Sequence, residues 1–168
     1  MRLRFLLLAA LLAAATPAVA QPTAVSAPVT RVVVNKAERQ LLLYAGEQLV
    51  RRYPINLGDA PVGHKTTEGD ERTPEGDYRL DWRNPNSRYH RSIHISYPNA
   101  ADRAQAKERG VSPGGDIMIH GLPNGLDWAA SVLANTDWTD GCIALTSNDD
   151  MDEVWQLVRD GTPIRINP

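Results

Sequence analysis

Short apolar runs separated by polar turns dominate the chain from residue 31 onward. Three such runs, rich in leucine or β-branched residues, occupy residues 31–34 (RVVV), 40–44 (QLLLY) and 48–57 (QLVRRYPINL). The segments between them, NKAER and AGE, are polar and turn-like. This pattern predicts three strands joined by hairpins, with Ala45 and Gly46 in the second turn.

Shorter runs of the same kind predict four further strands. They cover residues 77–82 (DYRLDW), 92–96 (SIHIS), 116–120 (DIMIH) and 162–166 (TPIRI). Residues 58–76 contain four glycines, two prolines and seven charged residues, a composition typical of a loop. Strands therefore account for most of the regular structure that we expect.

Three segments favour helices. Alanine-rich residues 100–109 predict a short surface helix, and residues 127–133 predict a second one. A third begins after Ser147 or Asn148, both good N-caps, and ends at residues 160–161. Its apolar stripe recurs at i, i+3, i+4 and i+7, through Met151, Val154, Trp155 and Val158. The predicted fold class is mainly β with short helices.

The first 20 residues have a different pattern. They begin with Arg2 and Arg4, continue as an apolar run over residues 5–15, and end on a small-residue A-x-A triplet. This is the pattern of a secretory signal peptide cleaved after Ala20. The apolar run is about half as long as a segment that spans ~30 Å of hydrocarbon, so no stable membrane insertion is expected. Residues 21–30 then form a linker and residues 31–168 a single domain, exported to the periplasm.

The charge balance excludes one class of partner. Without Arg2 and Arg4, 16 of the 18 Lys and Arg residues remain against 20 Asp and Glu, and the basic ones are scattered. Nucleic-acid binding proteins concentrate basic charge on one face, so no nucleic-acid partner is expected.

Cys142 is the single cysteine of the chain. It cannot form an internal disulfide, although exported proteins that use cysteine for stability carry it in pairs. It is either a buried, inert thiol or a reactive thiol that the chemistry requires. The count alone does not decide between these alternatives.

The sequence around Cys142 favours the reactive thiol. The segment IMIHG ends a predicted strand on His120, and the segment DWTDGCIAL presents Cys142 on a polar turn that precedes another apolar run. A thiol nucleophile needs an imidazole that takes its proton and returns it to the leaving amine. Gly141 allows backbone N–H groups to approach a developing oxyanion, and Gly121 leaves the imidazole exposed.

These segments resemble the YkuD-type L,D-transpeptidase catalytic domain, whose signature reads HG…[S/T]xGC. Two longer stretches, VVVNKAERQLLLYAGEQLVRRYPINLG and KTTEGDERTPEGDYRLDWRNPNSRYHRSIHISYPN, are also similar to that family, as is DGTPIRINP at the end. The resemblance extends over residues 31–166. It implies a β-sandwich-like catalytic domain and peptidoglycan stem peptides as substrates.

The resemblance also implies a role for individual residues. Cys142 would attack the carbonyl after the third residue of a stem peptide, with His120 as base and then acid. The Gly121 carbonyl would orient the imidazole, and the backbone N–H groups of Asp140, Gly141 and Cys142 would form the oxyanion hole. The residues implied to bind substrate are Tyr89, Ser96, Trp138 and Thr139. The acyl group would pass to an amine acceptor.

The chain departs from the commonest family pattern in three places. Asp140 stands where His is frequent, Ala144 stands where Arg is frequent, and the segment between His120 and Cys142 is longer than usual. The loss of that Arg removes an anchor for a substrate carboxylate. The GCxAxT form resembles the YafK-like branch, which includes an amidase that releases wall-linked lipoprotein. Such hydrolysis, or wall binding without catalysis, is therefore an alternative to transpeptidation.

Other features are expected to be structural. His90 and His94 have i, i+4 spacing but lie in a strand and loop, where this spacing does not converge on a metal. No metal and no cofactor are expected. Trp128 and Trp138 flank the long segment before Cys142 and could cover the cleft or pack beneath it, and packing is favoured. A sortase-type enzyme would need an Arg shortly after the cysteine, and the next one is Arg159.

Overall fold

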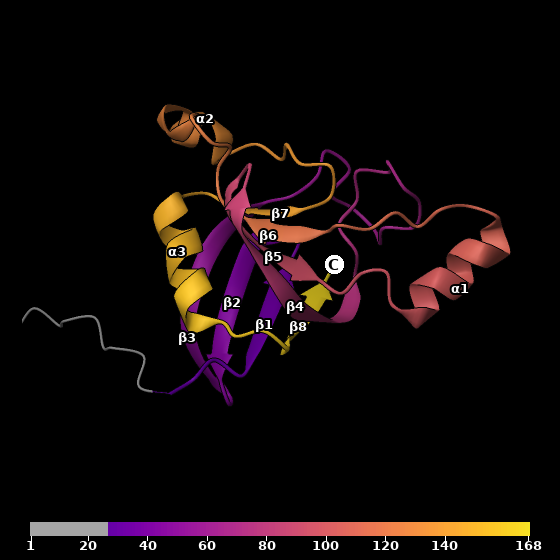
Figure 1. The fold of residues 1–168 in the computed structure, drawn as a ribbon, viewed down its shortest axis with the longest axis horizontal. Coiled ribbons are helices and arrows are strands. Elements are labelled where there is room, and N and C mark those ends of the chain that lie inside the picture. The colour runs from indigo at the N-terminus through magenta and orange to yellow at the C-terminus, as the bar shows by residue number, and fades with distance from the viewer. Residues whose placement is uncertain (1–26) are drawn as a thin grey trace, which may run out of the picture.

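The computed structural model describes residues 27–168 (Figure 1). The predicted signal peptide, its cleavage site and most of the predicted linker lie outside these residues. Within them, the strands are β1 (Arg31–Asn35), β2 (Gln40–Ala45), β3 (Gln48–Asn56), β4 (Gly76–Ser87), β5 (His90–Ile95), β6 (Met118–His120), β7 (Ile143–Leu145) and β8 (Thr162–Asn167). The helices are α1 (Ala100–Arg109), the 3₁₀ turn η1 (Asp127–Ala129), α2 (Ala130–Leu133) and α3 (Asn148–Leu157).

The described strands form a closed barrel in the order β1-β2-β3-β7-β6-β5-β4-β8. The prediction of a mainly β fold with short helices is confirmed, but the β-sandwich-like arrangement is wrong. Closure arises because β8 pairs in parallel with β1 and antiparallel with β4. Through β8, strands β1 and β4 each have a partner on both sides, whereas two stacked sheets would leave exposed edges.

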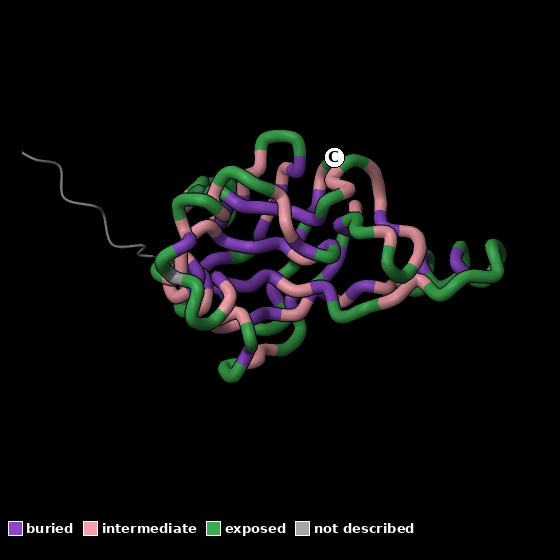
Figure 2. The backbone as a smooth tube through the Cα atoms, turned by 90° about the horizontal axis from the view of Figure 1, so that it is seen from above, coloured by how far each residue is buried: buried purple, intermediate pink, exposed green. Residues whose placement is uncertain are grey.

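The interior of the barrel is filled by aliphatic and aromatic side chains. Alternate residues of the strands point inward, such as Val32 and Val34 of β1 and Ile93 and Ile95 of β5, all with no exposed surface. Figure 2 shows buried backbone along the strands and exposed backbone in the loops and along much of α1. An eight-stranded barrel is just wide enough for its side chains to fill, and the buried core cluster fills it here.

The helices agree with the sequence patterns except at the C-terminal end of α3. Helix α1 has the predicted bounds and ends at Gly110, which is left-handed with φ 67°. Residues 127–133 divide into η1 and α2. Helix α3 begins at its Ser147 cap but ends at Leu157, three residues before the predicted end. The chain becomes extended at Val158, whose side chain is buried in the core.

Helix α3 covers the outer surface of the barrel beside β3 and β5 (Figure 1), whereas α1 extends away from it. Arg83 of β4 donates hydrogen bonds to the carbonyls of Trp155 and Val158 and satisfies the end of α3. Among residues 27–168, no helix has the length and apolar character needed to cross a membrane.

Candidate active site

Two short parallel strands bring the predicted nucleophile and base together. Strand β6 ends on His120, and β7 begins directly after Cys142, with His120 paired to Ala144 across the ladder. Cys142 is thus offset by two residues from the strand position opposite His120. Neighbouring strands lie ~4.8 Å apart and rise ~3.3 Å per residue, so the two side chains are neighbours on the barrel surface.

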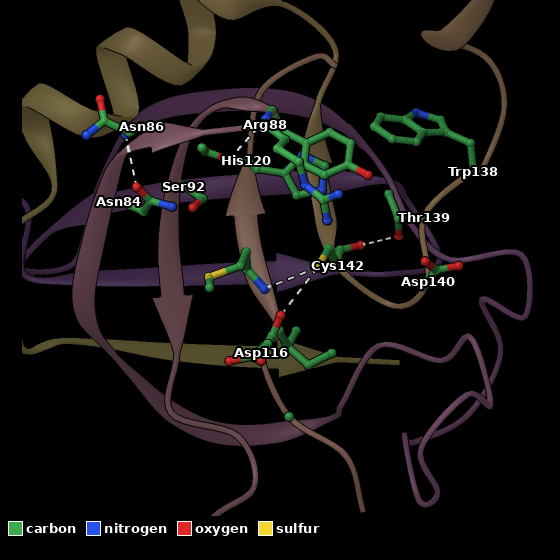
Figure 3. Close-up of a pocket in the computed structure, with 15 residues that line it drawn as sticks. Asn84, Asn86, Arg88, Ser92, Asp116, His120, Trp138, Thr139, Asp140 and Cys142 are labelled. Carbon is green, nitrogen blue, oxygen red and sulfur yellow. Dashed lines mark hydrogen bonds between the residues drawn. The ribbon is translucent and has the colours of Figure 1, made fainter. Parts of the chain in front are cut away.

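Both residues open into one cleft of about 400 Å³ (Figure 3). The cleft lies between the β4–β5 hairpin, β6 and the turn before β7. Its lining residues are Asn84, Asn86, Ser87, Arg88, Tyr89, Ser92, Gly115, Asp116, Ile117, Met118, His120, Trp138, Thr139, Asp140 and Cys142.

The His120 imidazole is nearly enclosed, with 3% of the residue exposed, so the expectation that Gly121 leaves it exposed was wrong. Its Nδ1 lies 2.7 Å from the carbonyl oxygen of Gly121, so this nitrogen carries the hydrogen and Nε2 is left with a free lone pair. The rings of Tyr89 and Trp138 lie 4.6 and 5.6 Å from the imidazole centroid. Burial lowers the pKa of His120 to about 4, against a smaller opposing effect of the Gly121 carbonyl. The imidazole is therefore neutral at physiological pH.

The Cys142 thiol lies against the backbone that leads into β6. Its Sγ accepts a hydrogen bond from the Met118 N–H at 3.4 Å and donates one to the Asp116 carbonyl at 3.7 Å. Burial raises the pKa of Cys142, and the carboxylates of Asp140 and Asp116 add to this effect, while the Met118 N–H and Lys65 oppose it. At rest the site is a neutral thiol beside a neutral imidazole.

The turn that carries Cys142 is braced by Thr139. The Thr139 hydroxyl donates to the Cys142 carbonyl at 2.7 Å and accepts from the Gly141 N–H at 3.2 Å. The Gly141 N–H, one of the three N–H groups expected to face an oxyanion, is thus hydrogen-bonded to Thr139 in this structure. The N–H groups of Asp140 and Cys142 have no hydrogen-bond acceptor among the described residues and remain available.

Gly141 is required by both its conformation and its surroundings. Its φ is +109°, a region that L residues rarely adopt, and a Cβ there would lie 2.5 Å from the Arg72 carbonyl oxygen. The buried Thr73 hydroxyl donates to the Gly141 carbonyl at 2.9 Å. The loop of residues 58–75 therefore packs directly against the nucleophile turn.

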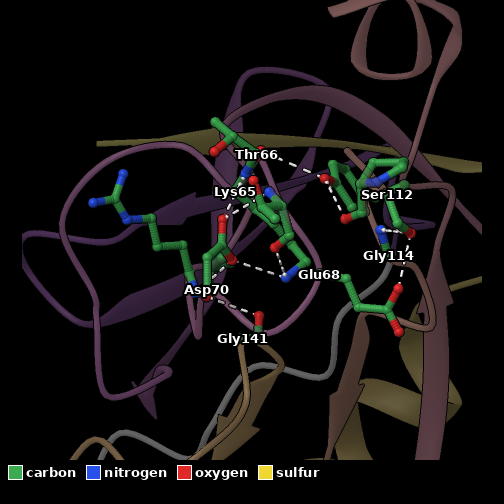
Figure 4. Close-up of polar contacts among 12 residues, drawn as sticks. Lys65, Thr66, Glu68, Asp70, Ser112, Gly114 and Gly141 are labelled. Carbon is green, nitrogen blue, oxygen red and sulfur yellow. Dashed lines mark hydrogen bonds and ion pairs between the residues drawn. The ribbon is translucent and has the colours of Figure 1, made fainter. Parts of the chain in front are cut away.

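Two buried lysines hold this loop in place. Lys36 donates to the carbonyls of Gly63 and Thr73 and to Glu75 Oε1, at 2.6, 3.1 and 2.8 Å. Lys65 pairs with Asp70 Oδ1 at 2.9 Å (Figure 4). The Asp70 carboxylate also accepts from the backbone N–H groups of residues 66, 67 and 72. Nothing in the residue pattern indicated that a polar, glycine-containing loop would be this closely bound.

Three of the four predicted substrate-binding residues line the cleft: Tyr89, Trp138 and Thr139. Ser96 does not. It follows the end of β5, where its hydroxyl accepts from the Arg79 N–H at 2.9 Å and faces a groove on the outside of β1, β4 and β8. Trp128 is 79% exposed, so the expectation that it packs was wrong.

Several cleft residues were not singled out from the sequence. Arg88 lies in the β4–β5 turn, Ser92 is paired with His120 across β5 and β6, and Asp116 and Met118 contact the thiol through their backbones. The alternation of residues 92–96 would have identified Ser92 as outward-facing. The other three depend on pairing between distant segments.

His90 and His94 do not converge. His90 Nε2 lies 2.7 Å from Asp152 Oδ1, and His94 Nδ1 lies 2.6 Å from Asp81 Oδ1. Residues 27–168 contain no group of three or more His, Cys, Asp or Glu side chains that could hold a metal ion.

Comparison with known proteins identifies relatives over most of the chain. The L,D-transpeptidase catalytic domain model (YkuD) matches residues 29–166. "Putative L,D-transpeptidase YafK" of Escherichia coli K12 is 38% identical over 132 residues, which cover 74% of this chain and 45% of that protein. The chain thus spans about half the length of the relatives it matches.

Two solved structures are similar in fold and sequence. The helical cell shape determining protein Pgp2 of Campylobacter jejuni has 28% identity and a TM-score of 0.60, with 84% of this chain and 48% of that chain covered. Bd1075 of Bdellovibrio bacteriovorus has 26% identity and a TM-score of 0.57, with the same two coverages.

Proposed function

The chain belongs to the L,D-transpeptidase catalytic domain family, and from this membership we propose that Cys142 and His120 catalyse acyl transfer on peptidoglycan stem peptides. The observation that carries the proposal is the pairing of His120 Nδ1 with the Gly121 carbonyl at 2.7 Å, beside a thiol in the same cleft. This contact leaves Nε2 as a base directed away from the backbone. Because His120 and Cys142 line the same cleft, a base at this nitrogen can take the proton of the thiol.

The acylation step begins with a neutral pair. Cys142 turns from the Asp116 carbonyl, its proton passes to His120 Nε2, and Sγ forms a bond to the carbonyl carbon after the third stem residue. The N–H groups of Asp140 and Cys142 donate to the oxyanion. The C–N bond then breaks, the imidazolium returns its proton to the leaving amine, and a thioester remains on Cys142.

Deacylation repeats these roles in reverse. An acceptor amine attacks the thioester while Nε2 removes its proton, the C–S bond breaks, and the proton returns to sulfur. Water in place of the amine would give hydrolysis. The Gly121 carbonyl stabilises the transient imidazolium in both steps, as an acidic side chain does in other triads.

Two further features support a peptide of the cell wall as the substrate. The cleft is open at the barrel surface and lined mostly by polar residues, which suits an extended, charged peptide. The predicted signal peptide of residues 1–20 would place the enzyme outside the cytoplasm, where such peptides are found.

The proposal is tested with purified chain and defined disaccharide tetrapeptides, analysed by mass spectrometry. A thioester adduct on Cys142 and new cross-linked dimers are expected. Peptides linked to a lipoprotein C-terminus, run in parallel, detect the hydrolytic alternative as release of the lipoprotein peptide. Cys142→Ala and His120→Ala are the inactive controls. If the wild-type chain forms no adduct and leaves every substrate unchanged, the proposed function is wrong, and binding without turnover would indicate a wall-binding protein.

A further inference from the structure

Arg88 is the one Lys or Arg residue among the described residues that line the cleft. Arg88 is exposed. Its guanidinium makes no hydrogen bond or ion pair with any side chain or backbone group of residues 27–168. Two carboxylates, Asp116 and Asp140, line the same cleft, yet neither pairs with it. Figure 3 shows Arg88 on one side of Cys142 and Asp116 on the opposite side. The nucleophile thus lies between a positive and a negative end of the cleft.

The backbone beneath Arg88 is held rigidly. The Arg88 carbonyl accepts from the Asn124 N–H at 3.0 Å, and the Tyr89 carbonyl accepts from the Gly121 N–H at 3.1 Å. Asn124 also donates from its side chain to the Ser87 carbonyl at 3.0 Å. The turn is therefore fixed to the same residue, Gly121, that orients the catalytic imidazole. The fixed backbone therefore places the unpaired guanidinium at the cleft, where it can pair with a ligand.

We propose that Arg88 binds a carboxylate of the substrate and is a specificity-determining residue of this cleft, an inference that rests on the proposed function for the identity of the peptide. A guanidinium matches a carboxylate with two parallel hydrogen bonds, whereas a lysine offers only a point charge. Asp116 and Asp140 repel a carboxylate at the other end. The charge pattern therefore selects a peptide with a free carboxylate near the scissile bond and sets its direction across Cys142.

The first test compares two substrates that differ only in charge. A stem peptide with a free terminal carboxylate and its C-terminal amide are assayed with wild-type chain, Arg88→Gln and Arg88→Lys. Hydrogen bonds to charged groups contribute enough that kcat/KM for the acid should fall about 10- to 100-fold in Arg88→Gln. The value for the amide should stay unchanged, and Arg88→Lys should recover part of the loss. The matched control is Arg52→Gln, an exposed arginine of β3 outside the cleft.

The second test needs no stem peptide. Alkylation of Cys142 by iodoacetate is compared with alkylation by neutral iodoacetamide at one pH, so that the thiolate fraction cancels in the ratio. In water, a unit charge about 4 Å from the thiol changes the local anion concentration by about fivefold, and a more distant charge changes it by less. Arg88→Gln should therefore lower the iodoacetate to iodoacetamide ratio by up to this factor at low salt and by less at high salt. Arg52→Gln should leave it unchanged.

These tests separate the two proposals. If no stem peptide is turned over but the alkylation ratio falls in Arg88→Gln, the carboxylate site stands and the proposed function fails. If stem peptides are turned over and Arg88→Gln changes neither the acid preference nor the alkylation ratio, Arg88 does not bind a carboxylate. An equal loss on acid and amide would also overturn the proposal, because it would indicate a structural role.

Discussion

Replacing Lys36 with methionine should loosen the loop that supports the nucleophile turn. Lys36 is 2% exposed, and its three Nζ donors bind Gly63, Thr73 and Glu75 across residues 58–75. Thr73 in turn binds the Gly141 carbonyl. Methionine keeps most of the volume of the lysine stem, so little cavity forms and the change chiefly removes the charge and its hydrogen bonds.

The expected loss of stability arises from the Glu75 carboxylate, which loses its partner in Lys36→Met. Removing one partner of a buried ion pair costs about 3–5 kcal/mol, because the other charge stays buried without compensation. The Glu75 side chain retains 20% exposure, which places the value near the lower end of that range. A loss of about 3 kcal/mol in the free energy of unfolding corresponds to a decrease in Tm of roughly 10 °C for a domain of this size.

The assay is urea denaturation followed by tryptophan fluorescence, with iodoacetamide labelling of Cys142 in native buffer as a readout of the site. Lys107→Met, on the exposed face of α1, is the matched control and should stay within about 0.5 kcal/mol of wild type. The double variant Lys36→Met/Glu75→Gln should recover part of the loss, since no unpaired carboxylate remains. A loss below about 1 kcal/mol in Lys36→Met would refute the view that this ion pair holds the loop.

Three further outcomes are expected. The pKa of His120 is about 4 in the folded chain and near 6.5 when unfolded, so only the unfolded state binds a proton between these values. The free energy of unfolding should therefore be full above pH 6.5 and fall by on the order of 3 kcal/mol as the pH drops towards 4. His120→Gln should flatten this dependence in urea titrations. Parallel curves for the two proteins would show that His120 does not cause the dependence. Gly141→Ala should lose about 2–4 kcal/mol of stability and most thiol reactivity, because φ is +109° and the new Cβ meets the Arg72 carbonyl. A stable, reactive variant would show that the turn can move. Asp140→Asn should lower the pKa of Cys142 and speed alkylation at neutral pH, and an unchanged rate–pH profile would exclude Asp140 as a cause of the raised pKa.

The sequence by itself determined the features that depend on neighbours along the chain. The hairpins of β1–β3 follow from apolar runs separated by turn residues, and α1 follows from an alanine-rich stretch that ends before Gly110. The candidate nucleophile and base were also recognised locally, because Cys142 and His120 each stand beside a glycine at one end of an apolar run.

Only the tertiary structure decided the features that depend on distant segments. Strand patterns are the same in a sandwich and in a barrel, and the difference lies in the pairing of β8 with β1, which are more than 120 residues apart. The same holds for Ser96, whose place outside the cleft is set by its hydrogen bond with Arg79 of β4. Arg88 and Cys142 line the same cleft because β4, β5, β6 and β7 are neighbours in the barrel. A residue pattern encodes which face of a strand is buried, but the register and closure of the sheet determine which side chains meet on the other face.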